Sequence, residues 1–260
     1  MHSQLIPGLP IQSFGLCIAL GVLLSWQILQ RLYKKEDMSN LLFLLVFVGL
    51  IGARITHVVE YWQEDGYARN PLAVFEIWKG GLVFYGGLVA GAVAFLAWCI
   101  LKGRSIVEMA DTVAVVVPLA HAFGRLGCFF HGCCWGKVSD SSLAVTFPAY
   151  SPVWAAHRAS DYAARSLPVL PVQLFEATLL LVLFGLLVFL YRRFGKYTAA
   201  AYLIGYSFVR FFTEFLRDDI RPEMFGLSSA QNFSLVMFAF GIVLLAWSYF
   251  RNEKSACHNR

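Results

Sequence analysis

Long, uninterrupted apolar segments are the feature that most constrains what this chain can fold into. Hydrophobic residues make up 58% of the 260 positions, and only 14% are charged, against about 25% in soluble domains. A helix needs about 20 apolar residues to cross a bilayer core. Seven segments qualify: 11–30, 41–61, 81–101, 106–127, 171–191, 198–216 and 228–250. They predict an all-α integral membrane protein, with residues 1–260 forming a single transmembrane domain, and they argue against a soluble enzyme or a disordered chain.

The positions of the Lys and Arg residues predict the orientation. More than half of the 21 lie in short connections and the tail, at 31–35, 102–104, 192–196 and 251–260. Connections rich in these residues stay in the cytoplasm. The N-terminus is therefore expected outside and the C-terminus inside, with residues 128–170 forming an external head or cap. The chain has no basic run interleaved with aromatic residues, so we expect no nucleic-acid partner.

Charged residues inside apolar segments are costly unless they are paired or hydrated. Arg210, Glu214 and Arg217 have i, i+4, i+7 spacing, which predicts one common helical face. That face is either an ion pair that seats the helix end or an anion-binding surface, in which Glu214 orients a guanidinium toward a phosphate.

A second charged group ends the fourth segment, where His121, Gly124 and Arg125 lie within one helical turn. A glycine there lets a ligand approach the backbone, whereas a buried imidazole and a snorkelling arginine are the plainer interpretations. Arg54 can also be interpreted as a snorkelling arginine. Glu176 can be interpreted simply as an acid that the helix dipole stabilises near a helix N-terminus. Asp111 is expected to cap a helix end, or to pair with a charged group, near the inner end of the fourth segment. Together the arginines and glutamates indicate a site for an anionic phospholipid headgroup.

The segment GGLVFYGGLVAG at residues 80–91 is rich in glycine. Gly87 and Gly91 form a GxxxG pair, which is typical of close helix packing. The same composition also allows a broken helix whose backbone amides face a polar cavity.

Three cysteines, Cys128, Cys133 and Cys134, lie close to His131 in one short stretch. Four interpretations stay open: a disulfide, small packing thiols at a glycine turn, a metal site, and a catalytic thiol that carries a transient group. Cys17 and Cys99 lie in apolar runs and are expected to be packing residues.

Several of these segments, taken in order, resemble the prolipoprotein diacylglyceryl transferase family over nearly the whole chain. The matching segments are GAR (52–54), IWKGGLVFYGGLVAG (77–91), GRLGCFFHGCCWG (124–136), PVQLFEA (171–177), FVRFFTEFLRDD (208–219) and GLSSAQ (226–231). The ordered set is far more specific than any one motif.

The resemblance implies a multi-pass protein of the bacterial inner membrane. Phosphatidylglycerol would donate its diacylglyceryl group to the lipobox cysteine of a preprolipoprotein, and glycerol 1-phosphate would leave. No cofactor and no metal is required by this scheme. Fixed guanidinium groups would stabilise the charge that grows on the leaving phosphate. The candidate catalytic residues are Arg125, Arg210, Tyr85 and Glu214, and the candidate substrate-binding residues are Arg54, Gly86, Gly87, Gly124, His121, Glu176 and Arg217.

The chain departs from the family pattern at four positions. Tyr85 stands where the family usually has His, and Phe14 where it has Tyr. Cys128 and Cys133 stand where the signature has Asn and Glu. Because of these departures, two alternative functions stay open. One is a transferase of the same fold with a glycan, a lipid or another thiol as acceptor. The other is a membrane protein that binds or transports an anionic lipid without catalysing a reaction.

Overall fold

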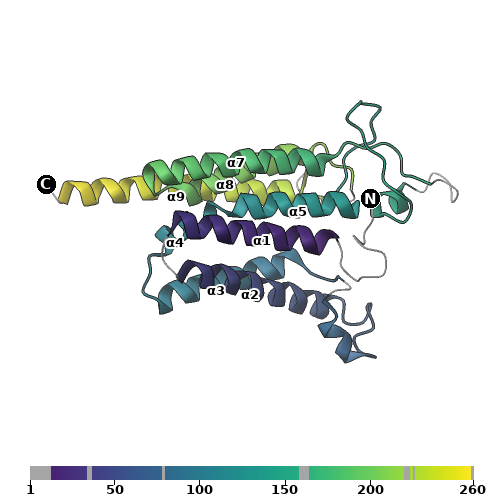
Figure 1. Cartoon of the computed structure of the whole chain (residues 1–260), viewed down its shortest axis with the longest axis horizontal. Helices are drawn as coiled ribbons and strands as arrows, with labels where there is room; N and C mark the ends of the chain where they lie inside the picture. The colour runs from purple at the N-terminus through teal and green to yellow at the C-terminus, as the bar shows by residue number, and fades with distance from the viewer. Residues whose placement is uncertain are drawn as a thin grey trace. The chain divides into compact units, whose positions relative to one another are not determined.

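The computed structural model describes residues 13–33, 37–77, 80–157, 164–219, 223–224 and 226–258. These residues are mostly helical (Figure 1). The helices are α1 (Ser13–Leu32), α2 (Asp37–Glu60), α3 (Phe84–Leu101), α4 (Ile106–Ala114), α5 (Val117–His131), α6 (Pro152–Ala156), α7 (Val172–Phe194), α8 (Thr198–Glu214) and α9 (Ser229–His258). A 3-10 turn, η1 (Pro71–Phe75), and a hairpin of β1 (Glu223–Met224) with β2 (Leu227–Ser228) complete the described elements.

The described helices confirm a membrane protein, with five or six candidate spans. By length and composition, α1, α3, α7 and most of α2 and α9 qualify, and α4 with α5 qualify together across a 43° bend. Helix α8 has only 17 residues, so it is too short to meet the same test. The seventh span and the orientation therefore stay predictions.

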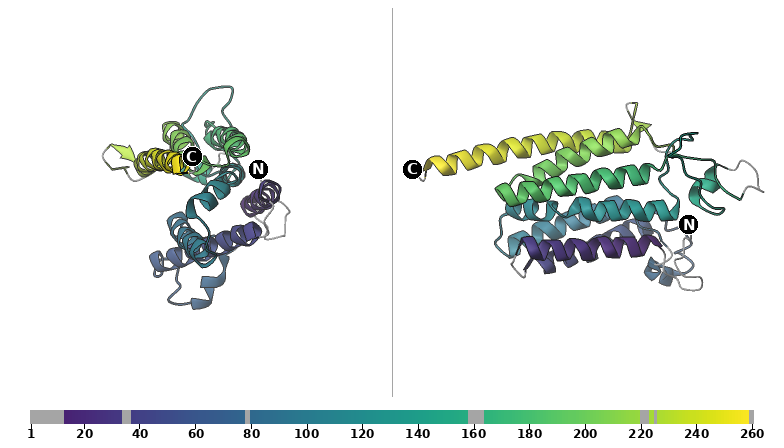
Figure 2. Two further views of the ribbon diagram at one scale, coloured as in Figure 1. Left: turned by 90° about the vertical axis from the view of Figure 1, so that its left-hand side faces the viewer. Right: turned by 45° about the horizontal axis from the view of Figure 1, so that its top comes forward.

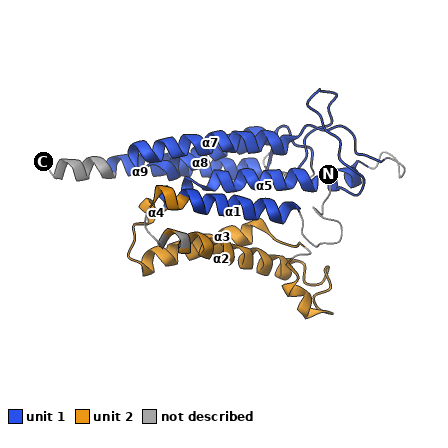
Figure 3. Cartoon of the chain, in the orientation of Figure 1, with its two compact units in different colours: residues 1–28, 110–260 blue, residues 29–109 orange. Residues whose placement is uncertain are grey.

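Contacts divide the chain into two compact units, one of residues 1–28 with 110–260 and one of residues 29–109 (Figure 3). The single transmembrane domain remains a prediction.

In the first unit, α5, α7, α8 and α9 lie side by side (Figure 2). Small residues allow α1 to pack closely against α5. A Cβ atom at Gly21 would lie 2.8 Å from the Phe123 Cβ, and one at Gly127 would lie 2.9 Å from the Phe14 ring. Asp111 accepts a hydrogen bond from the backbone N–H of Ala199 at 2.8 Å, which confirms its predicted capping role, here at the start of α8.

The segment between α5 and α7 forms a small head with its own apolar core. Phe147, Val153 and Val169 are fully buried there. Backbone bridges join Val169 to Val138 and Val145. The sequence predicted a head or cap here, and its external location stays a prediction.

In the second unit, glycines set the distance between α2 and α3. A Cβ atom at Gly86 would lie 2.6 Å from the carbonyl oxygen of Gly52 and would collide with Thr56, and one at Gly87 would lie 2.9 Å from the carbonyl oxygen of Gly49. Gly91 has nothing within 4 Å of such an atom. The predicted close packing is therefore confirmed at Gly87 and wrong at Gly91, because the second close contact is made by Gly86. Helix α3 itself is unbroken.

This geometry predicts opposite effects for two alanine substitutions. Gly86→Ala should lower the free energy of unfolding by about 1–3 kcal/mol, because the added methyl group has no room. Gly91→Ala should be neutral or should stabilise the protein by up to about 1 kcal/mol, because alanine is the better helix former. Unfolding of the purified variants in detergent measures both values. Equal effects at the two positions would contradict the assigned contacts.

Candidate anion-binding site

The site begins with a carboxylate on the buried face of α7. The buried residues of this helix recur at helical spacing: Val172, Gln173, Glu176, Ala177, Leu180, Leu183 and Leu187. Glu176 is 1% exposed. An ionised carboxylate at such a position needs a positive partner to offset its lost hydration.

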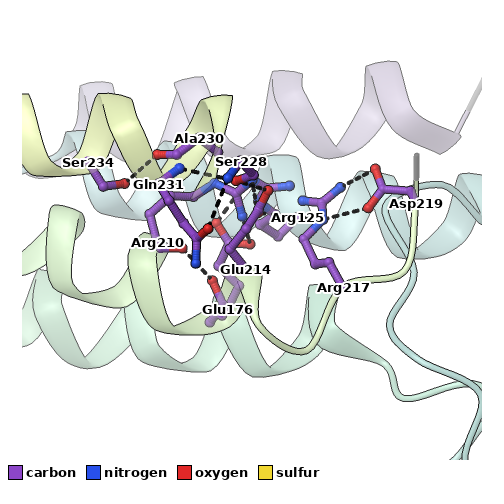
Figure 4. Close-up of polar contacts among 11 residues, drawn as sticks. Arg125, Glu176, Arg210, Glu214, Arg217, Asp219, Ser228, Ala230, Gln231 and Ser234 are labelled. Atoms are coloured by element: carbon purple, nitrogen blue, oxygen red, sulfur yellow. Dashed lines mark hydrogen bonds and ion pairs between the residues drawn. The ribbon is translucent and has the colours of Figure 1, made fainter. Parts of the chain in front are cut away.

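Two arginines from neighbouring helices meet Glu176 (Figure 4). Arg125 of α5 places Nη2 3.0 Å from Glu176 Oε1. Arg210 of α8 places Nη1 3.6 Å from Glu176 Oε2. One carboxylate thus joins three helices, and both predicted phosphate-binding arginines lie on it.

Glu214 extends the group at the end of α8. It pairs with Arg210 at 2.6 Å, and it accepts a hydrogen bond from the Ser228 hydroxyl at 2.8 Å. Ser228 is itself fixed by a capping box at the start of α9. Its Oγ accepts from the Gln231 backbone N–H at 3.2 Å, and the Gln231 side chain accepts from the Ser228 N–H at 3.0 Å.

Arg217 reaches the same group from beyond the helix. Its Nε lies 4.0 Å from Glu214 Oε2, and its guanidinium donates two hydrogen bonds of 2.8 Å to Asp219. The predicted proximity of Arg217 to Glu214 is correct. The predicted helical face was wrong at this residue, because α8 ends at Glu214.

We use the name arginine–carboxylate cluster for Arg125, Glu176, Arg210, Glu214, Arg217 and Asp219. Their formal charges cancel, so an anion is attracted by hydrogen-bond donors rather than by excess charge. Arg210 Nη1 is buried and makes no hydrogen bond among the residues that the structure describes, and its ion pair with Glu176 Oε2 is long, at 3.6 Å.

The cysteine loop that follows α5 is tied to this cluster by its backbone. Gly136 donates to the Leu170 carbonyl at 3.0 Å, and Asp218 donates to the Trp135 carbonyl at 3.4 Å. A Cβ atom at Gly136 would lie 2.9 Å from the Leu216 carbonyl oxygen. On the other side, the Gln173 side chain donates to the Cys133 carbonyl at 2.7 Å. The loop is therefore held between the start of α7 and the end of α8.

The thiols of Cys128, Cys133 and Cys134 converge. Their sulfur atoms lie within 4.8 Å of one another, and all three are free thiols. Hydrogen bonds from the other two thiols, helped by the charges of Arg217 and Arg125, lower the pKa of Cys134, although burial opposes the shift. The same contacts raise the pKa of Cys133. His131 is exposed and is not part of this group.

His121 and Gly124 lie beside the cluster, without direct contact to its carboxylates among the described interactions. The His121 ring packs edge-on against Tyr206 at 5.3 Å, and Tyr206 lies close enough to Arg125 to interact with its charge. A Cβ atom at Gly124 would lie 3.6 Å from the Ile18 side chain, so this glycine faces α1.

Arg54 lies in the second unit and is occupied by backbone. It donates to the carbonyls of Ala73, Val74, Gly80 and Gly81, at 2.7, 2.7, 2.9 and 3.1 Å. Gly81 has φ +76°, and a Cβ atom there would lie 2.6 Å from the guanidinium. Arg54 therefore holds the loop that leads into α3, where Tyr85 follows and is 54% exposed.

Four residues that support the site were not singled out from the sequence: Gln173, Tyr206, Ser228 and Gln231. Tyr206 precedes Arg210 by one helical turn, so periodicity was an available signal. Ser228 and Gln231 have capping-box spacing, which was a second one.

A family model for prolipoprotein diacylglyceryl transferase matches residues 2–247. The chain belongs to the prolipoprotein diacylglyceryl transferase family. It is 34% identical over 247 residues to phosphatidylglycerol–prolipoprotein diacylglyceryl transferase 2 of Clostridium perfringens, covering 91% of both chains. It is 34% identical to the transferase of Paraburkholderia phymatum, covering 86% of this chain and 81% of the relative. It is 33% identical to the transferase of Ralstonia pickettii, covering 87% of this chain and 83% of the relative.

The cluster predicts a large stability loss when its central charge is removed. Glu176→Gln keeps the side-chain shape but leaves the guanidinium groups of Arg125 and Arg210 without their shared partner. The free energy of unfolding should fall by about 3–5 kcal/mol. Glu60→Gln, at an exposed position of α2, should stay within about 0.5 kcal/mol of the parent. Similar unfolding curves for the two variants would rule out Glu176 as the central partner.

Proposed function

We propose that this protein transfers a diacylglyceryl group from phosphatidylglycerol to the cysteine thiol of a prolipoprotein. The names of the three relatives above specify this donor and this acceptor. They lend no support to a glycan, a lipid or another thiol as acceptor. The proposal rests mainly on the two guanidinium groups, of Arg125 and Arg210, that converge on Glu176, with Arg210 Nη1 ion-paired but not hydrogen-bonded.

The reaction is a displacement at a glycerol carbon. The acceptor thiol loses its proton, its sulfur attacks the carbon, and the carbon–oxygen bond to phosphate breaks. The phosphate gains one negative charge as glycerol 1-phosphate leaves. Donors that are fixed before this charge develops lower the barrier, because they need no reorganisation. Arg125 and Arg210 fill this role, and Glu176 and Glu214 are positioning residues that hold them.

Donor access sets the expected topology. Phosphatidylglycerol enters from the outer leaflet of the bacterial inner membrane, so the head that follows α5 faces outside. Helix α8 counts as the sixth of seven spans, and the C-terminus is cytoplasmic. The cluster lies at the end of α8 and the start of α7, next to the head, which supports a site near the outer surface.

Mass measurement of an acceptor peptide tests the function directly. Purified protein in lipid nanodiscs is incubated with phosphatidylglycerol and a peptide that carries a lipobox cysteine. The peptide should gain one diacylglyceryl group on its sulfur, with an equal amount of glycerol phosphate released. Stable binding of phosphatidylglycerol without either product would favour a lipid-binding or transport protein instead.

Lysine substitutions test the role of the arginines. Arg125→Lys and Arg210→Lys keep the charge but lose the planar fork that engages two oxygens. Turnover should fall at least tenfold while the variants still fold, because the lost contacts form with the leaving phosphate. Arg69→Lys, at an exposed position, is the control and should leave turnover unchanged. Normal turnover in both cluster variants would remove the arginines from the reaction.

Tyr85 is proposed to orient the phosphate rather than to act as a base. A neutral phenol contributes about one hydrogen bond to a charged partner, worth about 1.5–3 kcal/mol, so Tyr85→Phe should lower turnover roughly tenfold to hundredfold. Tyr150→Phe, at a position that is 92% exposed, should have no effect. Near-complete inactivation of Tyr85→Phe with rescue by Tyr85→His would instead identify a base. Full activity would place Tyr85 outside the site.

A further inference from the structure

The three converging thiols form a group that the arginine–carboxylate contacts do not explain. Their sulfur atoms lie within 4.8 Å of one another. Thiolates around one zinc ion each lie about 2.3 Å from the metal, which puts them about 4 Å apart. The group therefore has the size of a single-ion site. We propose that Cys128, Cys133 and Cys134 bind one Zn²⁺ ion.

The loop geometry explains how two adjacent cysteines point to one place. Neighbouring side chains in extended backbone project to opposite sides. Here Gly132 and Cys134 both have positive φ, +78° and +61°, so the chain turns back on itself. The left-handed conformation is unfavourable for cysteine, and the bonds from Gln173 and Gly136 hold the loop in place.

The charges around the sulfurs suit a zinc–thiolate complex. Three thiolates and one Zn²⁺ ion carry a net charge of about −1. Arg217 and Arg125 both lie close enough to Cys134 to interact with its sulfur electrostatically, and Arg125 does so with Cys128 as well. Hydrogen bonds and positive charge from such outer partners fix and stabilise metal ligands.

A disulfide accounts for less of the geometry. It would use two of the sulfurs and leave the third without a role, whereas all three converge. The three are also free thiols in the structure. Soft thiolate ligands in this number select zinc or monovalent copper over harder cations.

The ion would have a task in the transfer reaction, and this part rests on the proposed function. Three protein ligands leave a fourth position open, as in catalytic zinc sites. The acceptor thiol takes that position and gives its proton to water, since a coordinated thiol is deprotonated. The resulting thiolate attacks the glycerol carbon, and the electron pair of the broken carbon–oxygen bond leaves with the phosphate. Zinc would thus deprotonate the acceptor thiol.

Metal content tests the site without any assay of activity. The full-length protein is purified without chelator, dialysed against zinc, and measured by mass spectrometry of its metals. About one zinc per chain is expected. Cys128→Ser, Cys133→Ser and Cys134→Ser should each weaken zinc binding at least tenfold, and Cys99→Ser, at a buried thiol in the other unit, should not.

Three results would overturn the site. They are a zinc-free wild-type protein that does not take up the ion, zinc binding that survives all three serine substitutions, and an intramolecular disulfide within the trio in protein isolated without reductant. Cobalt as a spectroscopic substitute adds a second readout that is independent of folding yield, because thiolate-to-cobalt absorption reports the ligands themselves. Uptake of monovalent copper in preference to zinc would replace the assigned ion.

A chelation experiment tests the task of the ion. Removing zinc should lower transfer to the lipobox peptide at least tenfold, and adding zinc should restore it, with phosphatidylglycerol binding unchanged. Undiminished transfer by zinc-free protein would refute thiol activation. If neither form transfers the group, the proposed function fails, and the metal content alone decides the site.

Discussion

The buried carboxylate of Glu176 is the interaction on which the rest of the site depends. It lies on the otherwise mainly apolar inner face of α7, where a lone charge would be strongly unfavourable. Arg125 and Arg210 compensate it, and in doing so they connect α5, α7 and α8. The same contacts aim two guanidinium groups at one region. Stability and anion recognition therefore have a common physical origin in this protein.

Support for these charges comes from local structure. The capping box of Ser228 and Gln231 starts α9 and also places a hydroxyl on Glu214. Gln173, one turn before Glu176, holds the loop of Cys133. The start of α7 thus positions both the arginine–carboxylate cluster and the cysteine loop. This proximity is why a metal-bound thiol and a leaving phosphate fit into one reaction scheme.

The sequence predicted the parts of the site that obey local rules. Helical spacing placed Glu214 beside Arg210, and the cost of charge in apolar segments singled out Arg125. It grouped Glu176 with the arginines, but it did not predict that Glu176 would bridge Arg125 and Arg210, because a carboxylate near a helix N-terminus already has a local explanation and the contact with α5 is long-range. The same limit explains Gly91. A GxxxG spacing indicates a packing face, but it does not say which glycines meet the neighbouring helix.

The central claim is that Arg125 and Arg210 act on one phosphate as a unit held by Glu176. A double-mutant cycle of Arg125→Lys, Arg210→Lys and the combined variant tests it, with release of glycerol phosphate from phosphatidylglycerol as the measured rate. Residues that act as a unit are strongly non-additive. The account predicts that the combined variant is little slower than the slower single variant. Losses that multiply would show that the two arginines act independently, and would contradict the account.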